Sequence, residues 1–296
     1  MTTSASADAT SGNETISRFD RFKGMLWGLV VGDCLGSPIQ FTRKDGHPHV
    51  AEMLPCETFG TPPGYWTDDS SMAFCIMESV VRRRGYDLED IGHNFVRWMA
   101  DGFWSSLPYA FDLGGATRFA VRQINYGRLK NGDEETQGNG SIMRFAPSFV
   151  LNYGNADNKI LHEISDLTHK SGKVRETIDL MAKVCGEHTQ GKRTAVRSIY
   201  HTRAEVNNSG WAVSTLQAAL WAFETTVIFE EGLIAAVNLG GDADSIGAVF
   251  GQIAGAYYGF GAIPPRWVNA VKTHGKVNDL IEAFIGQCMG AEASPA

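Results

Sequence analysis

Residues 24–36 read GMLWGLVVGDCLG, and residues 247–259 read GAVFGQIAGAYYG. In both stretches glycine recurs at every fourth position, which places the glycines on one face of an α-helix. Glycine inside a helix costs about 1 kcal/mol relative to alanine, so two such ridges require a compensating gain. A face without Cβ atoms lets helices approach each other unusually closely. We therefore predict that both stretches form helices at the centre of a bundle and contact neighbouring helices through the ridges.

Helical periodicity also dominates the rest of the chain. Apolar residues recur at helical spacing in five segments that are separated by short breaks with Gly or Asp: 70–84, 88–99, 173–185, 213–225 and 277–288. Alternating strand-like patterns are scarce, and no Pro- or Ser-rich linker divides the chain. These patterns predict an all-α fold in a single domain, which we place at residues 18–290. Residues 1–17 are rich in Ser, Thr and Ala without apolar periodicity, which predicts a flexible tail.

The composition limits the kinds of partner and compartment. The chain has 296 residues, is 43% hydrophobic and carries a net charge of -7, so it buries a large core but lacks the basic surface that nucleic acid binding requires. Its five cysteines are scattered without a C-x-x-C pair, which indicates reduced thiols and argues against cysteine-bound zinc. The first residues lack the apolar stretch of a signal peptide. We expect the protein to be located in the cytoplasm, and the nucleus is the alternative. We expect no nucleic acid partner.

Residues 245–265 contain no charged side chain and are long enough to cross a membrane. The stretch is rich in glycine, contains Gln252 and directly follows a pair of carboxylates. These features favour a helix buried in a large core, and no membrane partner is expected.

Oxygen-bearing side chains cluster before the segment at 70–84, at Thr67, Asp68 and Asp69. Taken alone, they are typical of a helix start, where a Thr N-cap and first-turn Asp residues complement the unpaired backbone N–H groups and the helix dipole. A metal site is the alternative, since carboxylates and hydroxyls bind hard cations.

A second cluster repeats this chemistry before the 247–259 ridge, at Asp242, Asp244 and Ser245. Capping explains one of these residues but not two carboxylates one residue apart, because neighbouring negative charges repel unless a positive charge lies between them. A metal ion supplies that charge, and oxygen ligands favour Mg²⁺, Mn²⁺ or Ca²⁺ over zinc. Two such ions, about 3.5–4 Å apart, would orient the oxygens of a substrate and a water.

Four short segments carry a resemblance to a known family. In this order and spacing, residues 24–41, 66–72, 138–144 and 240–245 resemble the signatures of the ADP-ribosylglycohydrolase family, especially its dinitrogenase reductase-activating branch. The similarity extends over residues 21–287. The resemblance implies a compact all-α orthogonal bundle with a central cleft for two divalent cations, Mg²⁺ or Mn²⁺. It also implies hydrolysis of the glycosidic bond between ADP-ribose and its acceptor, which is a protein side chain or a small molecule.

The resemblance assigns roles to residues at matching positions. One ion would be held by Thr67, Asp68 and Asp69, and the other by Asp242, Asp244 and Ser245, with Asp244 bridging both. Asp112 lies in FDLGGAT, which is similar to a family segment beside the reactive ribose. It is our candidate for the general base, and a helix N-cap is the alternative. Contacts that support or bind the substrate would come from Asp33, Gln40, Asn139, Gly140, Ser141, Met143, His169 and Trp211.

Simpler interpretations stay open for the loop that carries four of these contacts, for His169 and for Trp211. The loop QGNGSIMR at 137–144 is also typical of an ordinary Asn-Gly turn, although backbone N–H groups beside a following helix favour a diphosphate. A lone His such as His169 is more often a packed or surface residue. Trp211 stands where the family frequently has Tyr, and it is equally typical of a core residue before an apolar helix.

Gln40 departs from the family pattern, because many relatives have Glu at this position. Gln neither acts as a base nor adds negative charge, so catalysis would depend on Asp112 and the cations. The main interpretation is a metal-dependent ADP-ribosyl glycohydrolase with an oxocarbenium-like transition state. The alternatives are a catalytically weak or inactive relative that binds ADP-ribose or has a structural role, and a hydrolase for another glycoside or phosphoester. The acceptor linkage, the preferred ion and the oligomeric state stay open.

Overall fold

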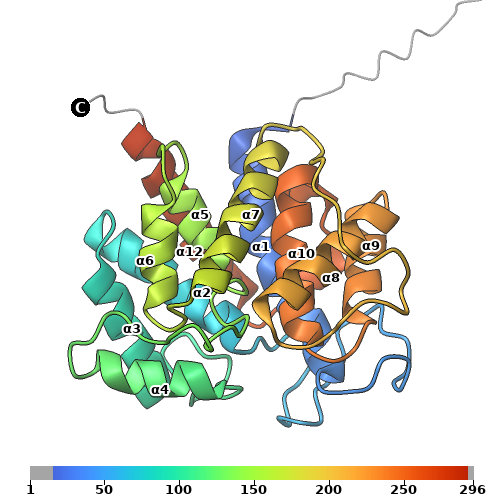
Figure 1. The fold of residues 1–296 in the computed structure, drawn as a ribbon, viewed down its shortest axis with the longest axis horizontal. Coiled ribbons are helices and arrows are strands. Elements are labelled where there is room, and N and C mark those ends of the chain that lie inside the picture. Colours follow the sequence, from blue (N-terminus) through green and yellow to red (C-terminus); the bar gives the residue numbers. More distant parts are fainter. Residues whose placement is uncertain (1–15, 293–296) are drawn as a thin grey trace, which may run out of the picture.

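The computed structural model describes residues 16–292 (Figure 1). Most of the predicted flexible tail, residues 1–15, lies outside the described residues. Within 16–292 the backbone forms α-helices, two 3-10 helices and two isolated β-bridges but no β-strand, so the predicted all-α class is confirmed. The elements are, in chain order, α1 (Arg18–Gly36), η1 (Ser37–Ile39), α2 (Asp68–Arg83), α3 (Leu88–Asp101), α4 (Gly115–Ile124), α5 (Phe145–Asn152), α6 (Lys159–Asp166), α7 (Gly172–Thr189), α8 (Ala212–Thr225), α9 (Phe229–Val237), α10 (Ala243–Tyr258), η2 (Phe260–Ala262), α11 (Pro265–Ala270) and α12 (His274–Glu292).

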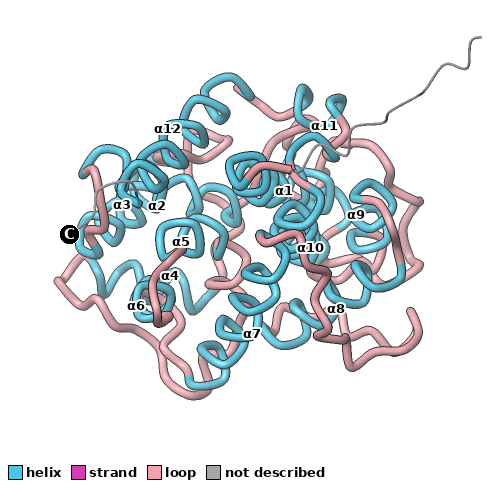
Figure 2. Tube along the Cα trace, turned by 90° about the horizontal axis from the view of Figure 1, so that it is seen from above, coloured by secondary structure: helices cyan, strands magenta, loops and turns pink. Residues whose placement is uncertain are grey.

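Helices α1 and α10 lie side by side in the bundle and touch along their glycine ridges (Figure 2). A Cβ atom on Gly28 would overlap the carbonyl of Gly251, and a Cβ atom on Gly251 would overlap the carbonyl of Gly28. Gly32 and Gly247 exclude side chains in the same reciprocal way. The prediction of close packing through the ridges is confirmed, and the partner of each ridge is the other ridge. Dense contact between two buried backbones is the gain that offsets the helix cost of glycine.

At its two ends, the contact between α1 and α10 is not made by pairs of glycines within the helices. Gly259 lies just beyond α10 with a φ of 77°, so it ends the helix where a continued ridge was expected. At the other end, Gly36 packs on the carbonyl of Ala243. The approach of α1 to the first residue of α10 brings the second acidic cluster close to the C-terminal end of α1.

Four of the five other segments predicted as helices lie within α3, α7, α8 and α12. The fifth corresponds to α2, which ends at Arg83 because Arg84 has a left-handed conformation with a φ of 59°. Apolar periodicity predicted no bounds for α4, α5, α6, α9 or α11, although a helix was expected after the loop at 137–144, where α5 lies, and the N-cap alternative for Asp112 implied one at α4. These helices have ten residues or fewer, which is too short for a helical period to be distinguished reliably.

None of the described helices is long and apolar enough to cross a membrane. The uncharged stretch at 245–265 forms most of α10, which is buried from Ala243 to Ala256. Its polar residue, Gln252, donates to the carbonyl of Met143 at 2.8 Å and accepts from the N–H of Ala146 at 2.7 Å. These bonds attach α10 to the loop that precedes α5 and to the first turn of α5.

Candidate active site

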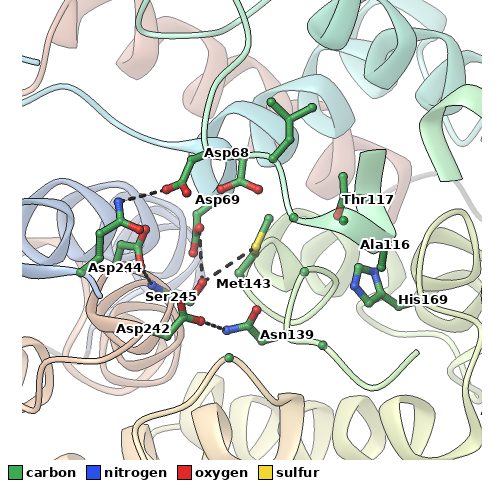
Figure 3. A pocket seen from close by; sticks show the side chains of 18 of the residues that line it. Asp68, Asp69, Ala116, Thr117, Asn139, Met143, His169, Asp242, Asp244 and Ser245 are labelled. Carbon is green, nitrogen blue, oxygen red and sulfur yellow. Dashed lines mark hydrogen bonds between the residues drawn. The ribbon is translucent and has the colours of Figure 1, made fainter. Parts of the chain in front are cut away.

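A cleft of about 350 Å³ opens where the N-terminal ends of α2 and α10 meet the loops before α4, α5 and α8 (Figure 3). Carboxylates gather on one side of it, and a glycine-rich loop and an imidazole form the other side. The cleft is lined by Gln40, Phe41, Asp68, Asp69, Asp112, Leu113, Gly114, Gly115, Ala116, Thr117, Gly138, Asn139, Gly140, Met143, His169, Gly210, Asp242, Asp244 and Ser245.

The N-terminus of α2 is capped from outside the helix. Asp33 of α1 accepts hydrogen bonds from the backbone N–H groups of Thr67 at 2.9 Å and Ser70 at 3.0 Å. It also accepts from the hydroxyls of Thr67 at 2.9 Å and Ser70 at 2.6 Å. Thr67 occupies the N-cap position, but its side chain makes no cap bond. The interpretation of Thr67 as a side-chain cap is therefore wrong, and Asp33 has that role from a buried position beneath the helix end.

The N-cap residue of α10 makes no side-chain cap bond either. Asp242 is the N-cap residue, but its carboxylate accepts a hydrogen bond from the side-chain amide of Asn139 instead of from the helix. The backbone N–H of Asp242 donates to the carbonyl of Asn208 at 2.9 Å. Gly240 and Gly241 have φ values of 66° and 65°, and a Cβ atom on Gly241 would collide with Asn208. The Gly-Gly pair is therefore required for the turn that carries both carboxylates of this cluster to the cleft.

The two acidic clusters meet at the base of the cleft. The hydroxyl of Ser245 lies 3.4 Å from Oδ2 of Asp69, although 176 positions separate the two residues in the chain. Thr67 Oγ1 lies 3.3 Å from the same carboxylate oxygen. The other oxygen of Asp69, Oδ1, is buried and has no hydrogen-bond partner among the described residues. A buried carboxylate oxygen without a partner is costly, so it points to a ligand at this place.

Burial and crowding oppose ionisation of these carboxylates. Burial is the largest cause that raises the pKa of Asp68, Asp69 and Asp244 well above the usual range for Asp, and neighbouring carboxylates add to it. Burial raises the pKa of Asp242 as well. The fully buried guanidinium of Arg144 interacts favourably with Asp68 and Asp69. One guanidinium does not balance four carboxylates, so additional positive charge would stabilise the ionised cluster.

The chemistry of these donors fits hard divalent cations. Carboxylate and hydroxyl oxygens are the ligands that Mg²⁺ and Mn²⁺ prefer, and the unpartnered Oδ1 of Asp69 is available to one of them. Within residues 16–292, no three His, Cys, Asp or Glu side chains form a metal-binding group on their own. Binding would thus require hydroxyls and solvent in addition to carboxylates, and the two-ion centre stays a prediction.

Asp112 enters the cleft from the loop before α4. That helix begins at Gly115 with Gly114 as its N-cap, so the alternative that Asp112 caps a helix is wrong. The backbone of Asp112 is left-handed with a φ of 59°, a conformation that is uncommon for non-glycine residues and recurs at functional sites. Its Oδ2 accepts a hydrogen bond of 3.0 Å from Nε2 of Gln40. Burial raises the pKa of Asp112 to about 6, and the bond from Gln40 acts in the opposite direction.

The glycine-rich loop and His169 form the opposite wall. Gly138 pairs with Trp211 in an isolated β-bridge, and the N–H of Asn139 donates at 2.9 Å to the carbonyl that precedes this Trp. A Cβ atom on Gly140 would lie 2.6 Å from Cε1 of the His169 ring. Because real side chains do not approach so closely, position 140 accepts only glycine while the ring stays in place.

Most residues predicted for the site surround this one cleft. Those in its lining are Gln40, Asp68, Asp69, Asp112, Asn139, Gly140, Met143, His169, Asp242, Asp244 and Ser245. Outside the lining, Asp33 is buried beneath the start of α2, Thr67 is buried at its N-cap position, and Ser141 is buried in its loop. Trp211 is 51% exposed and lies at a neighbouring hollow, which favours neither a core position nor a place in the main cleft.

Several lining residues were not singled out from the sequence. Gly114 is the N-cap residue of α4 and Gly115 its first residue, and a Gly-Gly pair at a helix start is a signal for a close backbone approach by an anion. Thr117 follows in the first turn of the same helix. Arg144, which does not line the cleft, lies in the family-like segment 138–144 but received no role from the sequence, because an Arg at the end of a polar loop is usually exposed.

A family model described as ADP-ribosylglycohydrolase matches residues 14–294. The chain belongs to the ADP-ribosylglycohydrolase family. The resemblance seen in four sequence segments is confirmed, and so is the assignment of this glycohydrolase as an enzyme that hydrolyses ADP-ribose linkages.

The glycohydrolase is similar to several named proteins over most of its length. The ADP-ribosylarginine hydrolase Tri1 of Pseudomonas putida is 33% identical over an alignment of 276 positions, and the match covers 85% of this chain and 74% of the relative. The ADP-ribosyl-[dinitrogen reductase] glycohydrolase of Rhodospirillum rubrum is 28% identical over 90% of this chain and 96% of the relative. A solved structure titled ADP-ribosylglycohydrolase-related protein complex has a TM-score of 0.81 and 35% identity, and the match covers 92% of this chain and 99% of that one.

Proposed function

We propose that this glycohydrolase releases ADP-ribose from arginine side chains in a reaction that requires two divalent cations, Mg²⁺ or Mn²⁺. The observation that carries the proposal is the meeting of Asp69 and Ser245 at the base of the cleft, beside a carboxylate oxygen that lacks a partner. The relative from Pseudomonas putida is named for ADP-ribosylarginine, which supports arginine as the acceptor. The ADP-ribosylated substrate is a protein or a small molecule.

The proposed ligands of one cation are Thr67, Asp68 and Asp69, and those of the other are Asp242, Asp244 and Ser245. When bound, such cations supply positive charge that orients ribose oxygens and makes a water more acidic. Thr67 suits this role because its one hydroxyl proton goes to Asp33 at 2.9 Å, which leaves the lone pairs of its oxygen available. Asp33 is thus proposed to support the ligands without contacting the substrate.

Asp112 is the proposed general base. The oxygen of a water bonds to the anomeric carbon of the distal ribose, the bond from that carbon to the acceptor nitrogen breaks, and a water proton passes to Asp112. The departing guanidine takes a proton from solvent, since its pKa is above about 12. With a pKa of about 6, Asp112 is mostly ionised at neutral pH and still basic enough to accept a proton. The bond from Gln40 to Oδ2 orients the carboxylate of Asp112 for this step.

The diphosphate is proposed to bind between the loop at 137–144 and the start of α4. Gly114 and Gly115 have open space where a Cβ atom would be, so their backbone is accessible to a ligand. Backbone N–H groups at a helix start attract anions through unpaired donors and the helix dipole. Asn139, Gly140 and Met143 line the facing wall, where the ribose and phosphate oxygens would lie.

The test is release of ADP-ribose from three substrates, ADP-ribosyl-arginine, ADP-ribosyl-serine and ADP-ribose-1″-phosphate, with Mg²⁺, with Mn²⁺ and with chelator. We expect cation-dependent release from the arginine linkage, and loss of it in Asp69→Asn and in Asp112→Asn. Asp279→Asn, which changes an exposed Asp on α12, is the matched control and should keep full activity. Release from another linkage alone would overturn the arginine assignment. Tight binding of ADP-ribose without any release would identify a binding protein instead.

A further inference from the structure

Three buried polar side chains form a connected series behind the cleft wall. Arg144 donates from Nη2 to Oγ1 of Thr168 at 2.7 Å, and the same oxygen lies 2.7 Å from Nδ1 of His169. All three residues are at least 97% buried, with exposures of 1%, 0% and 3% respectively. His169 lines the cleft (Figure 3), whereas Arg144 and Thr168 do not.

The direction of each hydrogen bond follows from what the groups are able to donate. A guanidinium only donates, so Thr168 accepts the bond from Arg144. The Thr168 hydroxyl has one proton that it is able to donate. Nδ1 of His169 is the only other hydrogen-bond partner of this oxygen among the described residues. If the ring donated from Nδ1, the hydroxyl proton would be buried without an acceptor. Thr168 therefore donates, and Nδ1 carries no proton.

A neutral imidazole without a proton on Nδ1 carries it on Nε2. Burial, followed by the positive charge of Arg144, lowers the pKa of His169 to about 3, so the ring is neutral at physiological pH. Its Nε2 edge faces the glycine-rich loop, since a Cβ atom would lie 3.4 Å from Nε2 if built on Gly138 and 3.0 Å if built on Gly140. The wall of the cleft therefore presents an uncharged N–H donor.

We propose that Arg144 and Thr168 are positioning residues, which fix His169 in the Nε2–H tautomer so that its ring donates a hydrogen bond to a phosphate oxygen of the substrate. The identity of the ligand rests on the proposed function, but the tautomer does not. A phosphate oxygen only accepts, so it matches an N–H donor, whereas the other tautomer would face it with a lone pair. The buried charge of Arg144 thus acts on the substrate through two other side chains.

Two substitutions at Thr168 separate the hydroxyl from the shape of the side chain. Thr168→Val removes the hydroxyl at nearly constant volume, and Thr168→Ser retains it. Long-range ¹H–¹⁵N spectra of the imidazole nitrogens report the tautomer, and calorimetry with ADP-ribose and with adenosine reports affinity. Neither measurement needs turnover, so a chain that binds ADP-ribose without hydrolysing it would contradict the proposed function and leave this test intact.

We expect wild type and Thr168→Ser to show a protonated Nε2 and a bare Nδ1. Thr168→Val should show a population with Nδ1–H and bind ADP-ribose about tenfold more weakly, with unchanged binding of adenosine, which has no phosphate. An Nδ1–H ring in wild type overturns the proposal, and so do an unchanged tautomer and affinity in Thr168→Val. An equal loss for adenosine overturns the phosphate assignment.

Thr177→Val is the matched control for the loss of a buried threonine hydroxyl. Thr177 Oγ1 donates to the carbonyl of Lys173 at 2.8 Å within α7, and neither residue lines the cleft. This variant also loses a buried threonine hydroxyl but should change neither the His169 tautomer nor the affinity for ADP-ribose. A weaker affinity in this control would mean that general destabilisation, and not the tautomer, accounts for the effect.

Discussion

Gln40 donates a 3.0 Å hydrogen bond from Nε2 to Oδ2 of Asp112, so the residue that departs from the family pattern holds the proposed general base. An amide donor stabilises the ionised carboxylate and opposes the burial that raises the pKa of Asp112 to about 6. A Glu at this position has no proton to donate when it is ionised. The residue at position 40 therefore affects the pH range in which Asp112 is ionised.

Gln40→Glu should move the acidic limb of the kcat/KM profile to higher pH by about one unit. Activity needs ionised Asp112, so it falls as the pH drops through the pKa of this carboxyl group. Glu removes a donor and adds a negative charge at hydrogen-bond distance, and both changes raise that pKa. Gln40→Met removes the donor without adding charge and should move the limb less. If wild type, Gln40→Glu and Gln40→Met had the same acidic limb, a different group would limit kcat/KM at low pH.

Asp69→Asn should stabilise the protein in chelator and weaken its stabilisation by Mg²⁺ or Mn²⁺. The substitution removes one of several buried carboxylates that repel each other, which should raise the free energy of unfolding without cations by about 1–2 kcal/mol. It also removes a proposed cation ligand. Thermal unfolding with chelator and across a cation titration measures both effects, and Asp279→Asn should change neither. A variant that Mg²⁺ stabilises as strongly as wild type would exclude Asp69 as a ligand.

Asp33→Ala should have the opposite effect on the protein in chelator. Asp33 accepts bonds from two backbone N–H groups and two hydroxyls at the start of α2, and alanine leaves these buried donors without a partner. We expect a loss of about 2–4 kcal/mol in the free energy of unfolding, measured by urea denaturation. Asp33→Asn retains one acceptor oxygen and should lose less. Equal stability of wild type and Asp33→Ala would mean that α2 does not depend on this cap.

The parts of the fold that the sequence predicted are those with a long, regular signal. Glycine at every fourth position indicated two closely packed helices, because close backbone contact offsets the helix cost of these residues. The pattern did not indicate that the two ridges are each other's partner, since spacing within a helix carries no information about its neighbour. Short helices such as α5 and α6 have too few turns for a period to stand out.

The sequence predicted most members of the candidate site but not how they interact with one another. Two carboxylates one residue apart at Asp242 and Asp244 indicated a shared counter-charge, and the structure brings them to Asp69. The role of Asp33 depends on partners more than thirty positions away, which only the fold places beside it. Arg144 is buried because of the loop that carries it, and no local pattern shows burial of a charged residue.

Gly28→Ala should cost about 3 kcal/mol in the free energy of unfolding, although alanine is the better helix former. The added methyl group would overlap the carbonyl of Gly251, and a backbone atom at the centre of the bundle does not move aside easily. Gly286→Ala in α12 is the matched control, because open space surrounds that position, and it should gain up to about 1 kcal/mol. Urea denaturation of both variants measures the contrast. A higher free energy of unfolding in both variants than in wild type would contradict the close packing of α1 and α10.

His188 is a buried group with a predictable effect on stability. It is completely buried and packs against the rings of Phe223 and Tyr257, and its Nδ1 is 2.9 Å from the carbonyl of Ile253. Nε2 has no partner in the described part of the chain. Burial is the main cause that lowers the pKa of His188 to about 4, and the charge of Arg193 adds to it.

Because the pKa of His188 is lower in the folded than in the unfolded chain, its contribution should reduce stability as the pH falls. Above a pH of about 6.5 the ring is neutral in the folded and in the unfolded chain. Between this pH and about 4, only the unfolded chain binds the proton, so the free energy of unfolding falls by up to about 3 kcal/mol. His188→Gln keeps a donor for the Ile253 carbonyl and should remove this part of the pH dependence. His93→Gln, at an exposed site on α3, should retain it. Urea denaturation between pH 4 and pH 7 compares the slopes, and a slope in His188→Gln equal to that of wild type would mean that another group takes up the proton.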